Sequence, residues 1–380
     1  MRVLLPLPQS QWRTPSQAQP KDQFGRENCT RFRVRARLND GHVVWCGWFN
    51  DREDFDQFLW ALATGSLQYE RELWRLPTPW WDSDIGEGLT YDFATVTFLT
   101  SPTGSNQTGW TVPNDWNNGN NSIETLGAGG SGGVAQGAGT RCASGGGGGA
   151  WNKTTNLTLT VGATPTWQIG TGGPAKTGNG AGTAGGDTWF NGTTLAGSSV
   201  GSKGGGAGSA ASGTVTGGAG GVGASGIGTS SNNGGNGGDV TGSPTNKNGT
   251  GGGGTAGTNG AGNAGVNLAS PTGSSSAGGS GDNGSGGSAG SSGGGTGGDG
   301  AEWDASHGSG GGGGGHQINS GAVTAGSGGN YGAGGGGAGS STTTTNSGAG
   351  IQGIIVITYT PPPIGKLLNI NQALNRASLW

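Results

Sequence analysis

Residues 278–293 read GGSGDNGSGGSAGSSG, with a glycine at every third position from Gly278 to Gly293. The same spacing recurs from Gly217 to Gly226 and from Gly326 to Gly335. A period of three residues is typical of an extended left-handed helix that has no internal hydrogen bonds and must bond to neighbouring segments. Collagen meets this need with a proline-rich repeat, but only four prolines lie between Gly127 and Gly350. The spacing therefore predicts a domain of packed polyglycine-II-like helices.

Glycine is concentrated in one part of the chain. Of the 94 glycines in 380 residues, 83 lie among the 224 residues from Gly127 to Gly350. Such a tract holds too few apolar side chains for an ordinary core. Backbone N–H and C=O groups must then supply the order, and they can approach each other closely only where a Cβ is absent.

Apolar stretches bracket and interrupt the glycine-rich tract. By their alternation and β-branched content, they are predicted to be strands that pair and close a domain over residues 106–361. The predicted strands are Trp110–Pro113, Ser122–Leu126, Leu157–Val161 and Gly353–Tyr359.

Residues 1–105 are predicted to form an α+β module for attachment or docking. Residues 31–38 and 43–49 alternate around Asp40-Gly41, which predicts a hairpin with Cys46 opposite Arg35. A helix is predicted after Asn50, and a further strand at residues 91–99. One face of the hairpin is a docking surface for an acidic partner, or a solvated face with local carboxylate partners. Its residues are Arg31, Arg33, Arg35, Arg37 and Trp48.

Residues 362–380 are predicted to form a short C-terminal helix. Leu367, Ile370 and Leu374 follow one another at helical spacing after a run of prolines. So short an apolar stripe is marginal alone, and we expect it to bind the same tail in a trimer or a neighbouring subunit. A frayed tail is the alternative.

Composition argues against several classes of function. The net charge is −3, with five Lys/Arg and six Asp/Glu between Gly127 and Gly350, so no nucleic-acid partner is expected. No apolar stretch is long enough for membrane insertion, and prolines interrupt the apolar start before it could form a signal peptide. Three cysteines predict free thiols, and the histidines show no metal-ligand spacing.

Catalysis is not predicted either. The stretch Gly170–Thr177 departs from a phosphate-binding loop at Ala175, where the motif requires glycine. The carboxylates of the tract are few and scattered, which disfavours a glycosidase. We therefore expect a protein that is not an enzyme and that needs neither cofactor nor metal.

Binding is better supported, because a few large or charged side chains stand out among small residues. Aromatic and carboxylate groups on a rigid scaffold suit a sugar or the loops of an outer-membrane protein. Alternatively, Trp189, Phe190 and Trp303 are apolar plugs that close the ends of the bundle. The candidate receptor-binding residues are Asp187, Trp189, Phe190, Glu302, Trp303, Asp304, His307, His316 and Tyr331.

Five stretches carry a resemblance to the glycine-rich domain of bacteriophage tail and prophage-encoded virion proteins. They are Gly109–Pro113, Ile123–Gly130, Gly145–Gly149, Thr158–Gly162 and Gly350–Thr360. The resemblance implies a structural virion component, often a tail fibre or a tail-tip adhesin with polyglycine-II packing. The expected partners are other virion proteins and a host cell-surface receptor.

The predicted protein is thus a homo-oligomer of the phage particle, with a trimer as the expected state, made in the host cytoplasm. A head fibre or capsid decoration protein is the alternative within the virion. A bacterial surface adhesin is a further alternative of a different class.

Overall fold

The structure is a computed structural model. It describes residues 94–362 apart from 103–105, 243–245, 270–274, 291–294, 305, 314–315, 318–322 and 342–344, together with two strands nearer the N-terminus. The chain divides into two compact units, Met1–Gly88 and Leu89–Trp380.

In the first unit, strands β1 (Phe32–Arg37) and β2 (Val43–Phe49) pair antiparallel, which confirms the predicted hairpin strands. Arg33 lies opposite Trp48, the pairing expected from the sequence. A bulge after Val34 then shifts the register, so that Arg35 faces Trp45 and not Cys46. The helix predicted after Asn50 and the C-terminal helix predicted in residues 362–380 lie outside the described residues.

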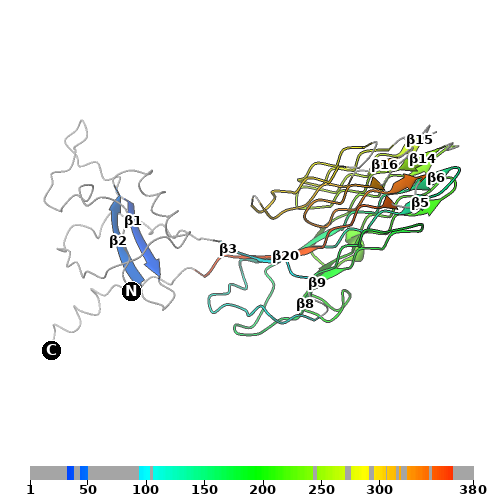
Figure 1. The fold of residues 1–380 in the computed structure, drawn as a ribbon. Coiled ribbons are helices and arrows are strands. Elements are labelled where there is room, and N and C mark those ends of the chain that lie inside the picture. Colours follow the sequence, from blue (N-terminus) through cyan, green and yellow to red (C-terminus); the bar gives the residue numbers. More distant parts are fainter. Residues whose placement is uncertain are drawn as a thin grey trace, which may run out of the picture. The chain divides into compact units, whose positions relative to one another are not determined.

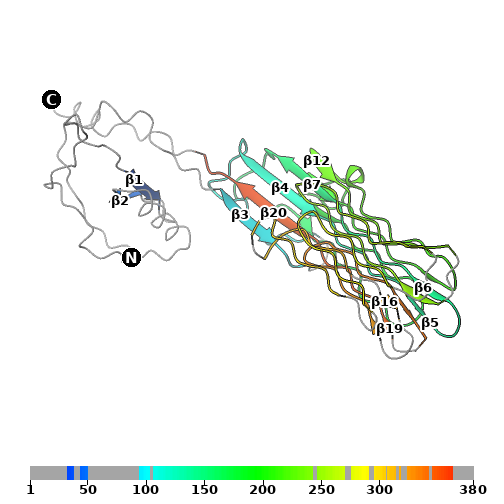
Figure 2. The same ribbon diagram turned by 90° about the horizontal axis from the view of Figure 1, so that it is seen from above.

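The second unit is built around a five-stranded antiparallel sheet of order β12-β7-β4-β20-β3 (Figures 1 and 2). Strand β20 is apolar and lies between β4 and β3, and every residue of it except Thr358 is buried. The strands are β3 (Thr95–Leu99), β4 (Asn121–Leu126), β7 (Trp151–Thr155), β12 (Ser230–Asn232) and β20 (Ile354–Tyr359).

Short strands form five smaller sheets in the same unit. One is antiparallel and consists of β8 (Trp167–Gln168), β9 (Thr188–Phe190) and β10 (Val200–Ser202). Another is mixed and consists of β6 (Arg141–Ala143), β11 (Ala210–Ala211) and β14 (Lys247–Gly249). The parallel sheets are β5 (Val134–Gln136) with β16 (His316–Gln317) and β18 (Ala338–Ser340); β13 (Val240–Thr241) with β15 (Leu268–Ala269); and β17 (Val323–Thr324) with β19 (Thr345–Asn346).

Two of the predicted bracketing strands are confirmed, and they pair with each other: Leu126 at the end of β4 lies opposite Ile354 at the start of β20. The predictions of strands at Trp110–Pro113 and Leu157–Val161 are wrong. These segments are loops in which Trp110, Val112 and Leu159 are buried and Val161 is exposed. The Asn118 and Asn121 side-chain oxygens accept the backbone N–H groups of Leu159 and Leu157. Alternation of apolar residues there reflects burial of a loop and not strand pairing.

The predicted fold class is also wrong. The second unit was expected to consist of packed helices with bracketing strands. The described residues are instead almost entirely β, about 1% helical, and include no helix of seven or more residues. Their helical element is the 3₁₀ turn Gly223–Ser225. Hydrogen bonds in the glycine-rich tract run between extended segments and not along a segment, so the tract is an assembly of strands and extended segments.

Each of these extended segments bonds to several neighbours in rotation. We call this pattern the glycine network, and residues 127–134 illustrate it. The N–H groups of Gly127, Gly130 and Gly133 donate to carbonyls of residues 144–150, at 2.9, 2.9 and 3.0 Å. Those of Ala128 and Ser131 donate to residues 183–186, at 3.1 and 2.9 Å. Those of Gly129 and Gly132 donate to residues 348–351, at 2.8 and 3.2 Å.

The glycine network leaves no room for a side chain at many of its glycine positions. A Cβ added to Gly147 would lie well under 3.0 Å from the Ala219 carbonyl oxygen, and one added to Gly130 would collide with that of Gly206. The obstructing atoms are backbone, which cannot swing aside as a side chain can. Close backbone approach, as expected from the glycine content, is therefore what the network requires.

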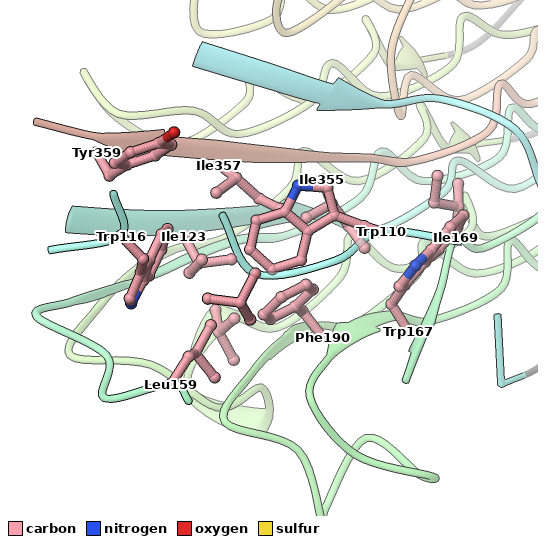
Figure 3. Packing of buried hydrophobic residues seen from close by; sticks show 12 residues of the cluster. Trp110, Trp116, Ile123, Leu159, Trp167, Ile169, Phe190, Ile355, Ile357 and Tyr359 are labelled. Atoms are coloured by element: carbon pink, nitrogen blue, oxygen red, sulfur yellow. The ribbon is translucent and has the colours of Figure 1, made fainter. Parts of the chain in front are cut away.

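Apolar side chains gather on both faces of the five-stranded sheet. One face, shown in Figure 3, carries Ile355 and Ile357 of β20 under the ring of Trp110, which meets Phe190 edge-on at 5.6 Å. The other face carries Ile354 and Val356 of β20. Because successive strand residues point to opposite faces, one strand contributes to both clusters.

Adding one methyl group to a glycine of the network tests how tightly the network is packed. Gly147→Ala is expected to lower the free energy of unfolding by more than about 3 kcal/mol, because the surrounding backbone cannot relax. Gly213→Ala, whose Cβ meets nothing within 4 Å, is the matched control and should change it by less than about 0.5 kcal/mol. Urea unfolding of both variants measures this, and equal effects would contradict the packing.

Candidate functional site

Three rings stack in parallel beside the second face of the sheet. His307 lies on Phe98 of β3 with ring centroids 3.8 Å apart and planes 4° apart. Tyr331 lies beyond His307, at 6.4 Å and 8°. We call Phe98, His307 and Tyr331 the aromatic stack. Phe98 lies in β3 at the edge of the sheet, and both Phe98 and Tyr331 pack against the apolar cluster of the second face.

The loop that carries His307 is closed by Asp304. This carboxylate accepts the backbone N–H groups of Ser306 and His307, at 2.7 and 2.8 Å, and lies 2.9 Å from Nδ1 of the His307 ring. The Ser306 backbone N–H and then the His307 ring lower the Asp304 pKa to about 2. Asp304 is exposed, so it presents a negative charge next to the rings at any physiological pH.

Trp303 and Tyr331 bind this loop to the sheet. Both are half-buried and pack against a cluster of Leu126, Trp151, Ala256, Ile354 and Val356. Burial, followed by the charges of Asp299 and Asp304, raises the pKa of the Tyr331 hydroxyl. The hydroxyl thus stays protonated and can donate a hydrogen bond.

Glu302 lies in the same loop, and its carboxyl group points away from solvent. Its Oε1 accepts the backbone N–H of Thr258 at 2.6 Å, and Asp282 accepts the N–H of Asn259 at 3.0 Å. The Glu302 pKa is raised to about 7. Burial is the main cause, the charges of Asp282 and Glu124 add to it, and the Thr258 N–H and the Ser309 hydroxyl act in the opposite direction.

The sheet beneath carries a buried carboxylate with its own partners. Glu124 of β4 accepts the indole N–H of Trp151 at 3.0 Å and pairs with Lys153 at 3.3 Å. Lys153 also lines a polar hollow with Ser122, Thr155 and Thr358. Thr358 lies opposite Val96, two residues from Phe98 on the same face of β3, so the hollow continues the surface of the aromatic stack.

The structure therefore brings five of the predicted receptor-binding residues together. They are Glu302, Trp303, Asp304, His307 and Tyr331. Aromatic faces are apolar and attract cations, and the flanking carboxylates accept hydrogen bonds from hydroxyl or ammonium groups. The arrangement suits a ligand with both an apolar face and hydrogen-bond donors.

The other predicted residues lie elsewhere. Asp187 pairs with Lys203 at 2.8 Å and accepts the N–H of Gly204. Trp189 is half-buried in β9, and its indole nitrogen has no hydrogen-bond partner among the described residues. Phe190 is fully buried in the cluster of Figure 3 and so does not reach the surface. His316 lies in β16.

The predicted docking residues belong to parts of the chain that are described little or not at all. Arg33, Arg35 and Arg37 lie in β1 and Trp48 lies in β2. Arg31, Leu367, Ile370 and Leu374 lie outside the described residues.

Sequence reasoning did not select Phe98, Asp282 or Asp299 for the site. Phe98 was assigned only to a strand, and the two aspartates were seen as scattered carboxylates. No local pattern connects Phe98 with His307, because their contact depends on how segments far apart in the chain are paired. The signal in the sequence that could have pointed to Phe98 is a large aromatic residue in the strand predicted at residues 91–99.

Comparisons with known proteins leave the family open. No protein-family model matches the chain, and no curated protein matches it. In the described part of the chain, no group of three or more His, Cys, Asp or Glu is placed to hold a metal ion. No helix described there could cross a membrane.

A stability measurement can show that Phe190 is a core residue and not a surface residue. Phe190→Ala is expected to cost about 3–5 kcal/mol of unfolding free energy, because it leaves a cavity under Trp110. Val222→Ala, at a side chain that is 49% exposed, serves as the control and should cost less than about 0.5 kcal/mol. A small effect of Phe190→Ala on urea unfolding would show that this residue is not in the core.

Proposed function

We propose that the chain is a structural protein of a tailed-bacteriophage virion that binds a host surface receptor without catalysing a reaction. The observation that carries this proposal is the aromatic stack, flanked by the exposed carboxylate of Asp304. Its residues rest on a sheet and a glycine network, so they are held in place before a ligand arrives. Pre-ordered aromatic and polar groups bind with a smaller entropic cost.

The receptor that fits this surface is a glycan or a loop of an outer-membrane protein. A sugar ring has an apolar face for Tyr331, the ring beyond His307 in the aromatic stack, and hydroxyl groups for Asp304. The polar hollow beside Lys153 and Thr358 extends the surface. Asp282 and Glu302 are less suited to glycoside cleavage, because backbone N–H groups already occupy one oxygen of each.

The rest of the proposal follows from the sequence motifs that bracket residues 106–361. We propose that residues 1–105 and the C-terminal tail dock the chain to other virion proteins, that it acts as a homo-trimer, and that its place is the tail fibre or tail tip. A capsid decoration protein would carry the same domain at another position on the particle. Electron microscopy with labelled antibody against the chain distinguishes these positions.

Adsorption to host cells tests the receptor-binding proposal. His307→Ala removes the middle ring of the aromatic stack, and Asp304→Asn removes the charge beside it. Each is expected to weaken adsorption of the purified chain at least fivefold to tenfold, or about 1–1.4 kcal/mol. Val266→Ala, at an exposed side chain of the glycine network, should leave adsorption unchanged.

Whole phage should compete with the wild-type chain for the same cells. Folding of each variant is checked by its urea midpoint. If both site variants fold and adsorb as the wild type does, the aromatic stack is not the receptor site.

A further inference from the structure

The segment from Gly300 to Gly308 carries Trp303 and His307, and its ends are anchored in the glycine network. Gly300 donates to the Asn330 carbonyl at 3.2 Å, and Tyr331 donates to that of Gly308 at 2.8 Å. Between these ends, Trp303 and His307 contact the sheet side, and another side chain connects the segment by a hydrogen bond to a different part of the network. That side chain is Glu302, which reaches the turn at residues 257–260.

Two carboxylates converge on this turn. A Cβ placed on Gly257 would collide with both Oδ2 of Asp282 and Oε2 of Glu302, so the two oxygens lie over the same bare Cα. The Thr258 N–H occupies Oε1 of Glu302, and the Asn259 N–H occupies Oδ2 of Asp282. Oε2 of Glu302 is buried, and no hydrogen bond of normal geometry reaches it from the described residues. The Ser309 hydroxyl lies close enough to the carboxyl to lower its pKa, but it does not offset the effect of burial.

The charges around Glu302 leave this oxygen uncompensated. Asp282 faces it from the neighbouring segment and Glu124 faces it from β4, while Lys153 is already paired with Glu124 at 3.3 Å. On its own segment, Asp304 is paired with His307. A buried acceptor among like charges is costly unless a proton or another donor satisfies it.

We propose that Glu302 and Asp282 share a proton, and that this shared proton holds the Gly300–Gly308 segment against the turn at residues 257–260. The O–H on Oε2 of Glu302 donates to the Asp282 carboxylate. When the proton leaves to solvent, two carboxylates face each other over Gly257 and the contact opens. Glu302 is then a positioning residue for the aromatic stack, and not a group that touches the receptor.

The direction of the pH dependence follows from the sign of the shift. The Glu302 pKa is raised from 4.5 to about 7, so the folded segment binds the proton more tightly than the free one. Its contribution is complete below pH 4.5 and is lost as the pH rises through about 7. The segment that carries His307 is therefore held in place at mildly acidic pH and becomes more mobile at alkaline pH.

Hydrogen–deuterium exchange of the full chain, without any ligand, tests this. Glu302→Gln keeps the shape and supplies a permanent N–H donor toward Asp282, so its segment should stay closed at all pH values. Wild type and Glu302→Gln are expected to exchange residues 301–308 at equal rates at pH 5.5. At pH 8.5 the wild type should exchange these residues at least fivefold faster than Glu302→Gln does at the same pH.

Asp304→Asn is the matched control. It loosens the segment at both pH values but keeps the Glu302–Asp282 pair, so it should retain the wild-type dependence on pH. Exchange of residues 145–150 reports that each variant is folded. If the ratio between wild type and Glu302→Gln is the same at both pH values, the shared proton is excluded.

The pH effect on receptor binding rests on the proposed function, but this test does not. Exchange is measured without receptor, so adsorption can fail while the pH-dependent contact stands, and the reverse also holds.

Discussion

Hydrogen bonding of the backbone in three directions is the constraint on which the second unit depends. Every N–H and C=O group that leaves water needs a partner. In residues 127–134 the partners rotate among three neighbouring segments, and the segment at residues 145–150 is bonded in the same rotating way. Because the neighbours surround each segment, a side chain at these positions would occupy the space of a carbonyl oxygen. Glycine is thus required by the packing, although each one costs more backbone entropy than another residue.

The five-stranded sheet gives this network an apolar boundary. Strand β20 inserts one set of side chains into the cluster around Trp110 and the opposite set into the cluster around Trp151. The first cluster anchors loops that have no strand structure of their own. The second supports the aromatic stack, and it places the ring of Phe98 where His307 can lie on it. In the candidate site, the sheet contributes Phe98 and the supporting cluster, and the glycine-rich tract contributes His307 and Tyr331.

Part of this arrangement could be predicted from the sequence. The apolar runs that became β4 and β20 and the alternating strands of the hairpin were correctly identified. Glu302, Trp303 and His307 stood out because large or charged residues are rare in the tract. The same reasoning selected Phe190, which is buried, since rarity alone does not tell a core residue from a surface one. Pairing within the network could not be derived, because its segments are nearly identical: nothing local indicates that Gly146 donates to Gly335.

Hydrogen-bond couplings measured by NMR between amide nitrogen and carbonyl carbon test the glycine network most directly. In the full chain, the amides of Gly130, Ser131 and Gly132 should show couplings to the carbonyls of Gly147, Thr183 and Gly348, three consecutive donors with three different partners. Couplings of all three amides to a single neighbouring segment would indicate an ordinary flat sheet. That result, or the absence of any coupling in these residues, would contradict the account.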